Sequence, residues 1–401
     1  MALGYDFFAR NRARLLEKLG GGLVILSAND EMQQAGDMAY PFRQESNFWW
    51  LTGIEQPGWW VIIEGRHGQT TLVSPALSDA KMLFDGGLSV TEAKNISDAD
   101  AVITADALPA KLAALSKKYK HVHILGPDPR QKHYEFVMNP GSARVKKAVT
   151  PHFSHIDDCR HDLAELRAIK SSEEIAAIRR AVDVTVEAFE FARIKLSRVQ
   201  TEYELLAEFD YHMRSHNANH AYDPIVAGGA HACTLHYTAN NDTLRAGELV
   251  VLDIGARVDG YAADVTRTWG VGEVDARRRA VHQAVVAVQT QIVDLIKPGL
   301  TVEAYIMGVD DIMREALRSL GLACEGIEMY RRYFPHAISH GLGVDVHDSL
   351  GGAHALTAGM VLTVEPGVYI PEEGIGVRIE DDILVTAHGA ENLSAKLSTA
   401  Y

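Results

Sequence analysis

Two aspartates interrupt a segment that otherwise has the pattern of a buried β-hairpin. The segment ELVVLDIGARVDGYAADVTRTW covers residues 248–269 and carries Asp253 in its first strand and Asp264 at the start of its second. A turn centred on 258–259 places the two side chains directly opposite each other. A turn centred on 259–260 makes them diagonal neighbours, and in both cases they lie about 5–8 Å apart on one face. Because buried carboxylates this close repel each other, the pair requires a shared proton or a cation.

A second hairpin near the C-terminus repeats the arrangement. MVLTVEPGVYIPEEGIGVRIEDDILVT, residues 360–386, has the pattern of two strands around the turn PEEG. The midpoint between Glu365 and Glu380 falls inside that turn, so these glutamates are expected to face each other as well. Four carboxylates in two hairpins predict an oxygen-rich site for divalent cations.

Nitrogen ligands are available in FPHAISHGLGVDVHD, residues 334–348, which contains His336, His340 and His347. Glycines and β-branched residues favour extended structure over helix in this segment, and in a strand His336 and His340 share a face. One of them is expected to complete a mixed Asp/Glu/His site.

A second group of histidines competes for the role of metal ligand. YHMRSHNANH places His212, His216 and His220 four residues apart, and on a helix this spacing forms one stripe that is able to bind zinc. The carboxylate nearest to it in sequence is Asp210. We interpret the stripe as a helix face near a pocket or an interface, with a zinc site as the alternative.

The composition narrows the class of protein. The chain has 401 residues, 47% of them hydrophobic and 23% charged, and a formal net charge of −14, which is typical of a soluble globular protein and argues against a nucleic-acid surface. No run of about 18 apolar residues is present, and the N-terminal residues lack the pattern of a signal peptide, so no membrane partner is expected. Three widely spaced cysteines favour a reduced, cytoplasmic chain.

The elements that must position these residues divide between two domains, as the length predicts. GGLVILSA and WWVIIEG predict strands and AKLAALSKKY a helix, so we expect an α/β domain with a mixed sheet over residues 1–160. Ser171 and Glu174 have the spacing of a capping box before a long amphipathic helix, which opens a second domain over 161–401. The boundary is expected within 155–172, and the later helices and hairpins predict helices packed on antiparallel sheet.

Four motifs together resemble the Xaa-Pro peptidases, aminopeptidase P and prolidase: LDIGARVDGYAADVTRTW, PHAISHGLGVDVHD, TVEPGVY and GVRIEDD. YPFRQESNFWWLTGIEQPG, residues 40–58, is similar to the N-terminal domain of that family. The resemblance implies an α/β (α+β) chain with two parts. A mixed-sheet, creatinase-like N-terminal domain would serve substrate access and oligomerisation, and a C-terminal pita-bread domain would carry a dinuclear metallopeptidase site.

The resemblance also implies a metal-ligand set. Two divalent metal ions per subunit, commonly manganese with cobalt or zinc as substitutes, would be held by Asp253, Asp264, His340, Glu365 and Glu380. Asp264 and Glu380 would bridge the two ions, and Glu365 would also act as the general base.

Further residues would serve the substrate, a peptide with proline at its second position. His236, His336 and His347 would bind it and stabilise the tetrahedral intermediate, and Arg378, Tyr369 and Tyr222 would support this network. Histidines donate hydrogen bonds to a developing oxyanion, which makes these roles chemically sound. A proline nitrogen in a peptide bond carries no N–H, so the pocket must recognise a ring by its shape.

The length of the substrate separates the two activities of the family. Prolidases usually carry an arginine between the HD motif and the VEPG hairpin, where it reads the carboxylate of a dipeptide, and this chain has none in HDSLGGAHALTAGM, residues 347–360. Arg43, or Arg331 and Arg332, would have to substitute. The first domain resembles that of aminopeptidase P, but the compact length is compatible with a bacterial-type prolidase. We therefore favour an Xaa-Pro dipeptidase, and Xaa-Pro aminopeptidase is the alternative. A homodimer is expected on symmetry grounds, and a tetramer remains open.

Other classes fit less well. A creatinase-like hydrolase without metal shares the fold, and a catalytically inactive pseudo-enzyme would only bind peptides. The complete set of five ligands argues against both. A methionine aminopeptidase would lack the whole first domain.

Overall fold

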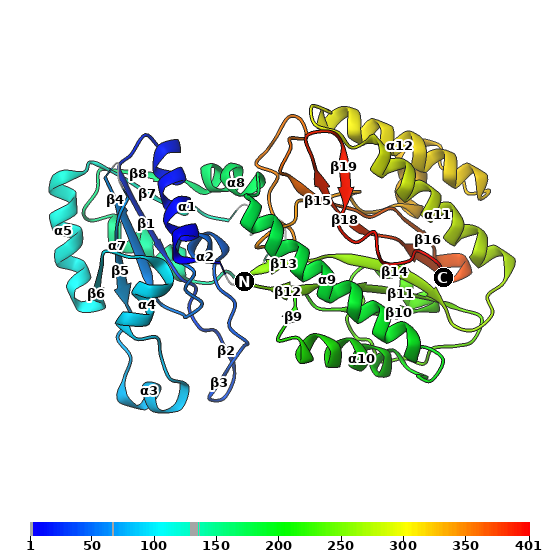
Figure 1. Ribbon diagram of the computed structural model, residues 1–401, viewed down its shortest axis with the longest axis horizontal. Helices are drawn as coiled ribbons and strands as arrows, with labels where there is room; N and C mark the ends of the chain where they lie inside the picture. Colours follow the sequence, from blue (N-terminus) through cyan, green and yellow to red (C-terminus); the bar gives the residue numbers. More distant parts are fainter. Residues whose placement is uncertain (1–2, 66–67, 129–134, 136) are drawn as a thin grey trace. The chain divides into compact units, whose positions relative to one another are not determined.

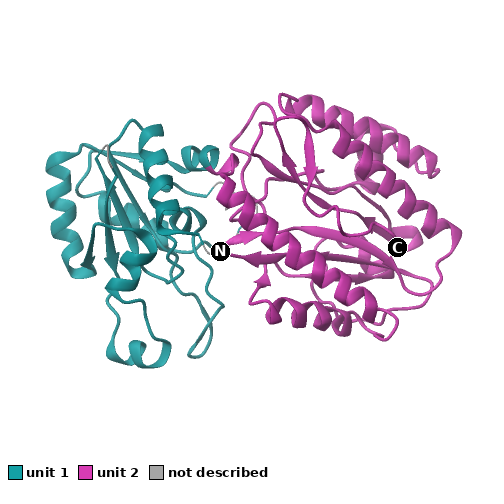
Figure 2. Ribbon diagram, viewed as in Figure 1, with its two compact units in different colours: residues 1–166 teal, residues 167–401 magenta. Residues whose placement is uncertain are grey.

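The computed structural model describes residues 3–65, 68–128, 135 and 137–401, which form two compact units. The first is residues 1–166 and the second is residues 167–401 (Figure 2). The division falls inside helix α8 (Arg160–Ala168). Each unit is described by itself.

The first unit is built on a six-stranded sheet with the order β6-β5-β4-β1-β7-β8 (Figure 1). β1 pairs with β4, and β4 with β5, in antiparallel fashion, whereas the pairs β1–β7, β5–β6 and β7–β8 are parallel. The predicted mixed sheet is therefore confirmed. The strands are β1 (Leu23–Ser27), β4 (Trp60–Glu64), β5 (Gln69–Ser74), β6 (Ala101–Thr104), β7 (His121–Ile124) and β8 (His155–Asp158).

Apolar side chains from helices α5 and α7 close the core of this sheet. Leu112 and Leu115 of α5 and Val145 and Val149 of α7 cluster with inward residues of the central strands. The helices of the unit are α1 (Tyr5–Lys18), α2 (Ser46–Thr52), α3 (Asp79–Asp85), α4 (Val90–Ser97), α5 (Leu108–Lys118) and α7 (Gly141–Val149). A short hairpin, β2 (Gln33–Ala35) and β3 (Met38–Ala39), extends from it.

The second unit packs long helices against several small antiparallel sheets, ordered β10-β11-β14, β13-β12-β9, β15-β18-β19 and β16-β17. Helices α9 and α10 contact strands of the first hairpin region, α11 and α13 contact those of the second, and α12 packs on α11 (Figure 1). The helices are α9 (Ser172–Lys195), α10 (Glu202–Ser215), α11 (Ala276–Leu295), α12 (Val302–Ser319) and α13 (Gly326–Tyr333). The predicted capping box of Ser171 and Glu174 opens α9.

The strands of the second unit are two to six residues long. They are β9 (Asn219–His220), β10 (Ile225–Gly228), β11 (Leu249–Ile254), β12 (Ala256–Val258), β13 (Tyr261–Ala262), β14 (Val265–Gly270), β15 (Val361–Val364), β16 (Gly367–Ile370), β17 (Ile375–Arg378), β18 (Asp381–Val385) and β19 (Ala390–Asn392). Two 3₁₀ turns accompany them, η2 (Gly229–Cys233) and η3 (Pro371–Glu373).

The register of the first hairpin selects one of the two predicted arrangements. Asp253 pairs with Thr266 rather than with Asp264, so the two aspartates are diagonal neighbours. The turn lies at Asp259 and Gly260, which both have positive φ, 49° and 82°. This is the conformation that a two-residue hairpin turn with the strand twist requires, and an Asp-Gly pair adopts it readily.

The second hairpin has the predicted register. Val364 pairs with Asp381 and Gly367 pairs with Arg378. The positions between these pairs bring Glu365 opposite Glu380, where neither belongs to a regular strand.

One expectation about the histidine segments holds in part and another was wrong. Residues 334–349 form no helix, and the stretch 338–342 is extended beside 361–365, joined to it by backbone hydrogen bonds. Only isolated bridges form there, at Gly341, so the stretch is not a regular strand. The stripe of His212, His216 and His220 is broken. Helix α10 ends at Ser215, His216 is its C-cap, and His220 lies in β9, where its Nε2 contacts Asp210 Oδ1 at 2.6 Å.

Among the described residues, no helix is both long enough and apolar enough to cross a membrane.

Candidate metal centre

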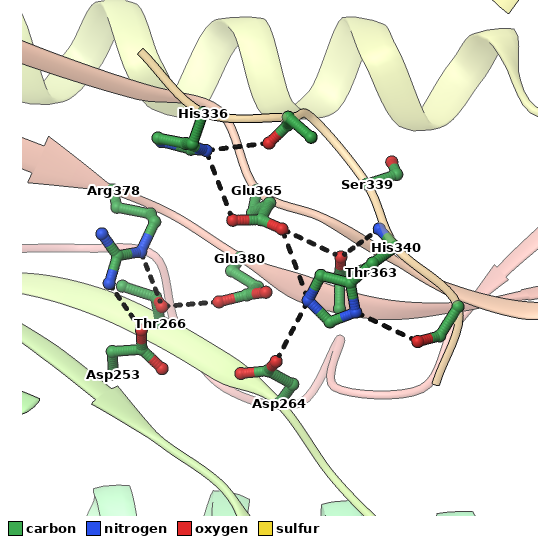
Figure 3. A network of polar contacts seen from close by, with 12 residues as sticks. Asp253, Asp264, Thr266, His336, Ser339, His340, Thr363, Glu365, Arg378 and Glu380 are labelled. Atoms are coloured by element: carbon green, nitrogen blue, oxygen red, sulfur yellow. Dashed lines mark hydrogen bonds and ion pairs between the residues drawn. The ribbon is translucent and has the colours of Figure 1, made fainter. Parts of the chain in front are cut away.

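The four carboxylates come from strand ends of the two hairpins and converge at one place (Figure 3). Asp253 lies in β11, Asp264 directly precedes β14, Glu365 follows β15, and Glu380 directly precedes β18. The two hairpins are joined through Thr266, whose backbone pairs with that of Glu380 and whose hydroxyl donates to Glu380 Oε2 at 2.6 Å. This bridge fixes the distance between the aspartate pair and the glutamate pair.

His340 supplies the nitrogen of the cluster. Its Nε2 lies 3.4 Å from Asp264 Oδ2 and 3.5 Å from Glu365 Oε1. Its Nδ1 lies 3.0 Å from the carbonyl oxygen of Gly341, which can only accept a hydrogen bond. The proton therefore sits on Nδ1, and Nε2 presents a lone pair to the carboxylates whenever the ring is neutral, as in most histidines that bind metals.

The acids at this site resist ionisation. Burial raises the pKa of Glu365 to about 7, and burial together with Asp264 and Glu365 raises the pKa of Glu380 well above its usual value. Burial also raises the pKa of Asp264, against the opposing effect of the hydrogen bond with His340. The positively charged side chains of the protein therefore do not fully balance the charge that these carboxylates would carry if all of them were ionised.

A bound cation would supply the missing positive charge. Ligand atoms of Asp264, His340 and Glu380 all lie within 4.8 Å of one another, and Glu365 and Asp253 flank them. A set of four carboxylates and one imidazole is typical of sites for divalent ions such as manganese, cobalt or zinc. The five residues that the resemblance implies therefore fit two such ions in donor chemistry and in charge.

Arg378 partly offsets the charge on one side. Its Nη2 lies 2.5 Å from Asp253 Oδ2, and its Nη1 donates to the hydroxyl of Tyr369 at 2.8 Å. Burial alone lowers the pKa of Arg378, but Tyr369, Asp253 and Glu380 outweigh it and keep the guanidinium charged. The carboxylate of Asp253 is therefore paired with the guanidinium of Arg378 through Oδ2.

Tyr369 continues this chain of contacts to His336. Because the hydroxyl accepts from Arg378, its own proton is free for His336 Nε2, 2.9 Å away. His336 Nδ1 faces the carbonyl oxygen of Ala337 at 2.8 Å, so Nδ1 carries the ring proton. Burial and the nearby Arg378 lower the pKa of His336 to about 3, so the ring is neutral at physiological pH.

Tyr222 lies between the two aspartates. Its hydroxyl is 2.5 Å from Asp253 Oδ1 and 2.6 Å from Asp264 Oδ1. Burial, followed by the two aspartates and Glu380, raises the pKa of Tyr222 well above its usual value. The single phenol proton can serve only one of the carboxylates at a time, so it relieves the repulsion only in part.

The remaining residues predicted to bind substrate are not part of the carboxylate cluster itself. His347 is exposed, and its ring packs edge-on against His340 with centroids 4.3 Å apart. His236 is exposed in the turn after η2, a segment that packs on β16 and β17. Arg332 is an exposed residue of α13 that pairs with Glu372 at 3.5 Å. Arg43 belongs to the first unit, and its role remains a prediction.

Sequence reasoning missed the carboxylate of Asp382. Its Oδ2 accepts from the backbone N–H of Asp264 at 3.0 Å, and it is fully buried in β18. Burial and Asp264 raise its pKa well above the usual value. Two consecutive acids directly after Glu380, at the start of an otherwise apolar strand, were the available signal.

It also missed the buried contacts that hold the His347 segment. Asp348 accepts from Arg167 Nη2 at 2.9 Å and lies 3.8 Å from Lys170 Nζ, and both cations are buried. Asp345 accepts from the same Arg167 nitrogen at 2.8 Å. The turn that carries His347 is thus tied to the start of the second unit on both sides.

Glu202 anchors the segment that carries His236 in a similar way. It is fully buried, and its Oε1 accepts from the backbone N–H of Gly228 at 2.9 Å. Its Oε2 accepts from Tyr237 Oη at 2.8 Å and from the backbone N–H of Asp242 at 2.9 Å. One carboxylate therefore holds both ends of the loop around His236.

Comparison with protein families gives two matches in sequence order. Residues 176–387 match the family described as metallopeptidase family M24. Residues 8–125 match the family described as aminopeptidase P, N-terminal domain. All five candidate metal ligands lie within the first match.

Similar proteins and structures are found over nearly the whole chain. The Xaa-Pro aminopeptidase of Escherichia coli is 32% identical over 97% of this chain and 94% of its own. An Xaa-Pro dipeptidase of Pyrococcus furiosus is 35% identical, but over 62% of this chain and 68% of its own. A structure described as a putative aminopeptidase P from Bacillus anthracis has a TM-score of 0.89 and 32% identity, covering 99% of this chain and 96% of that one. A zinc-substituted aminopeptidase P from E. coli, in complex with product, has a TM-score of 0.88 and 29% identity, with the same coverage.

Proposed function

The chain belongs to metallopeptidase family M24, and we propose that it is an Xaa-Pro aminopeptidase, which releases the first residue of peptides with proline at the second position. The observation that carries the proposal is the extent of the similarity. Relatives named Xaa-Pro aminopeptidase match both units, whereas the relative named dipeptidase matches 62% of the chain. The dipeptidase reading favoured from the sequence is accordingly replaced by its alternative.

The arginines that were expected to read a dipeptide carboxylate support this change. Arg332 pairs with Glu372, and Arg331 Nη1 faces the carbonyl oxygens of Pro335 and His336 at 3.4 Å. Both are thereby engaged with groups of the protein itself. Residues 347–360 contain no arginine, so this loop supplies no guanidinium for a free C-terminal carboxylate.

Two divalent ions would be held by Asp253, Asp264, His340, Glu365 and Glu380, and when bound they would lower the pKa of a water molecule and polarise the scissile carbonyl. Glu365 is the proposed general base. Its side chain lies within the ligand cluster, with Oε1 3.5 Å from His340 Nε2, so the carboxylate can accept a proton from a water molecule held there and return it. The leaving proline nitrogen needs that proton, because it departs as a secondary amine.

Orientation of the substrate would come from the chain's histidines. His336 is neutral and is held by Tyr369 and the Ala337 carbonyl, so its ring plane is fixed in advance. His236 and His347 are exposed and would provide hydrogen bonds to the peptide, from segments anchored by Glu202 and by Asp348. Fixed donors of this kind stabilise charge that develops in the transition state without reorganising.

Three further parts of the proposal have other grounds. Manganese as the natural ion rests on the resemblance and on the oxygen-rich donor set. A cytoplasmic location rests on three free cysteines. A homodimer rests on the general preference of soluble proteins for two-fold symmetry.

Substrate length gives the decisive experiment. The purified protein, with added manganese, is assayed on an Xaa-Pro dipeptide and on an Xaa-Pro-Yaa tripeptide with the same first residue. We expect the larger kcat/KM with the tripeptide. Hydrolysis of the dipeptide alone would return the assignment to a prolidase, and no metal-stimulated hydrolysis of either would end the peptidase assignment.

A further inference from the structure

A second cluster of side chains able to bind a metal lies on the helix pair α9–α10 and includes no residue of the two hairpins. It consists of Glu187 on α9, His212 on α10 and His216 at the C-cap of α10. Carboxylate Oε2 of Glu187 is 3.7 Å from His212 Nε2 and 3.8 Å from His216 Nε2. The three ligand atoms all lie within 4.8 Å of one another.

Hydrogen bonding within the cluster leaves its nitrogens available. His216 Nδ1 lies 2.8 Å from the carbonyl oxygen of His212, so the ring proton sits on Nδ1 and the Nε2 lone pair faces Glu187. His212 Nε2 is buried and has no hydrogen-bond partner among the described residues. A buried ring nitrogen without a partner is costly, and here it is directed at two other ligand atoms.

The contacts to Glu187 are too long for hydrogen bonds, which end near 3.2–3.5 Å. They match the spacing of ligands around a small cation instead. Tetrahedral zinc with bonds of about 2.0–2.1 Å has ligand atoms about 3.3 Å apart. The contacts of 3.7 and 3.8 Å from Glu187 to the two histidines exceed that spacing by a few tenths of an ångström. The rings of His212 and His216 are stacked with centroids 4.3 Å apart, so the two imidazoles lie side by side.

We propose that Glu187, His212 and His216 form a separate site for a zinc-like divalent transition metal, with water completing the coordination. Two imidazoles and one carboxylate are a donor set that zinc accepts readily and that magnesium and calcium do not favour. The site is on the surface, since Glu187 and His216 are exposed, so an ion reaches it from solvent without passing through the substrate site.

Metal stoichiometry tests the proposal independently of activity. The purified full-length protein is dialysed to equilibrium against buffered zinc, and bound zinc per chain is measured by elemental analysis. We expect one zinc equivalent fewer in His216→Ala and in Glu187→Gln than in the unsubstituted protein. Both side chains are exposed, so neither change removes a buried contact of the core.

His388→Ala is the matched control, because His388 is an exposed histidine of the same unit outside the cluster. It should bind as much zinc as the unsubstituted protein. Equal zinc in the unsubstituted protein, His216→Ala and Glu187→Gln would overturn the site. Because the measurement counts metal and not turnover, its failure leaves the proposed peptidase function untouched.

Discussion

The second unit contains two clusters of histidine and carboxylate that differ in how the chain surrounds them. At the hairpins, Asp264 and Glu380 are buried and the pKa values of both acids are raised. On α9–α10, Glu187 and His216 face solvent. Water can solvate the second cluster when no ion is present, but it cannot solvate the first. Burial therefore makes the ions part of the stability and the chemistry of the first cluster, and an optional addition to the second.

The largest effect is expected from removing a buried ligand. Asp264→Asn and Glu380→Gln should each abolish metal retention and lower kcat/KM on an Xaa-Pro-Yaa tripeptide. The loss should exceed the roughly 10–100-fold that follows removal of a partner outside the ligand set, because each residue reaches both ions in the implied arrangement. Elemental analysis and steady-state kinetics measure the two effects.

Glu187→Gln is the comparison variant for the same measurements. It removes an exposed carboxylate and should keep the full kcat/KM. If Asp264→Asn or Glu380→Gln retains near-normal activity, the hairpin cluster is not the catalytic centre.

Metal removal should destabilise the protein in a pH-dependent manner. The pKa of Glu365 in the folded, metal-free chain is about 7, above its ordinary value of 4.5. A raised carboxyl pKa contributes stability below about pH 4.5 that is lost as the pH rises through 7, by an amount on the order of a few kcal/mol at most. Asp264 and Glu380 shift in the same direction.

The thermal midpoint of the chelated protein should therefore fall between pH 5 and pH 8 more steeply than that of chelated Glu365→Gln. Excess manganese should remove the difference between the two proteins in slope. If the thermal midpoints of the two chelated proteins change with pH at the same rate, other groups relieve the repulsion among these acids. Scanning calorimetry or dye-monitored unfolding with chelator gives the values.

A smaller effect is expected from the contacts behind the ligands. Tyr369→Phe removes the hydroxyl that accepts from Arg378 and donates to His336. kcat should fall by roughly 10–100-fold while metal content stays the same, because the ligands remain and only their support is lost. Tyr330→Phe serves as control, since it removes a buried hydroxyl that donates to Asp310 outside the centre. An equal loss in both variants would indicate a general packing defect.

The smallest effect should come from the surface cluster. Zinc at ten times its dissociation constant stabilises a site by about 1.4 kcal/mol, which for a unit of this size corresponds to a few degrees in thermal midpoint. The unsubstituted protein should gain that increment over His216→Ala when zinc is added. If added zinc raises the thermal midpoint equally in both proteins, the stabilisation comes from zinc bound at the hairpin cluster.

Much of the architecture was predictable because local rules decide it. The mixed sheet of the first unit, the capping box of Ser171 and Glu174, and the position of the second hairpin about its turn follow from periodicity and cap chemistry. The extended form expected for 334–348 holds for 338–342, which hydrogen-bonds to 361–365, but only isolated bridges form there and no regular strand. The stripe of His212, His216 and His220 failed because α10 ends before its last member.

The sequence by itself determined which residues were available: four carboxylates in two hairpins, and histidines in the segment that precedes the second. Covalent spacing and side-chain alternation are local properties, so no tertiary contact is needed to recognise them.

Only the tertiary structure decided what those residues do to one another. The link between Thr266 and Glu380, the proton positions on His336 and His340, and the buried carboxylate of Asp382 depend on segments more than 20 residues apart or on loop conformation. The same holds for Glu187 and the two histidines of α10, which meet through the packing of two helices. The physical reason is that burial and through-space charge set each pKa and each hydrogen bond, and neither is encoded by distance along the chain.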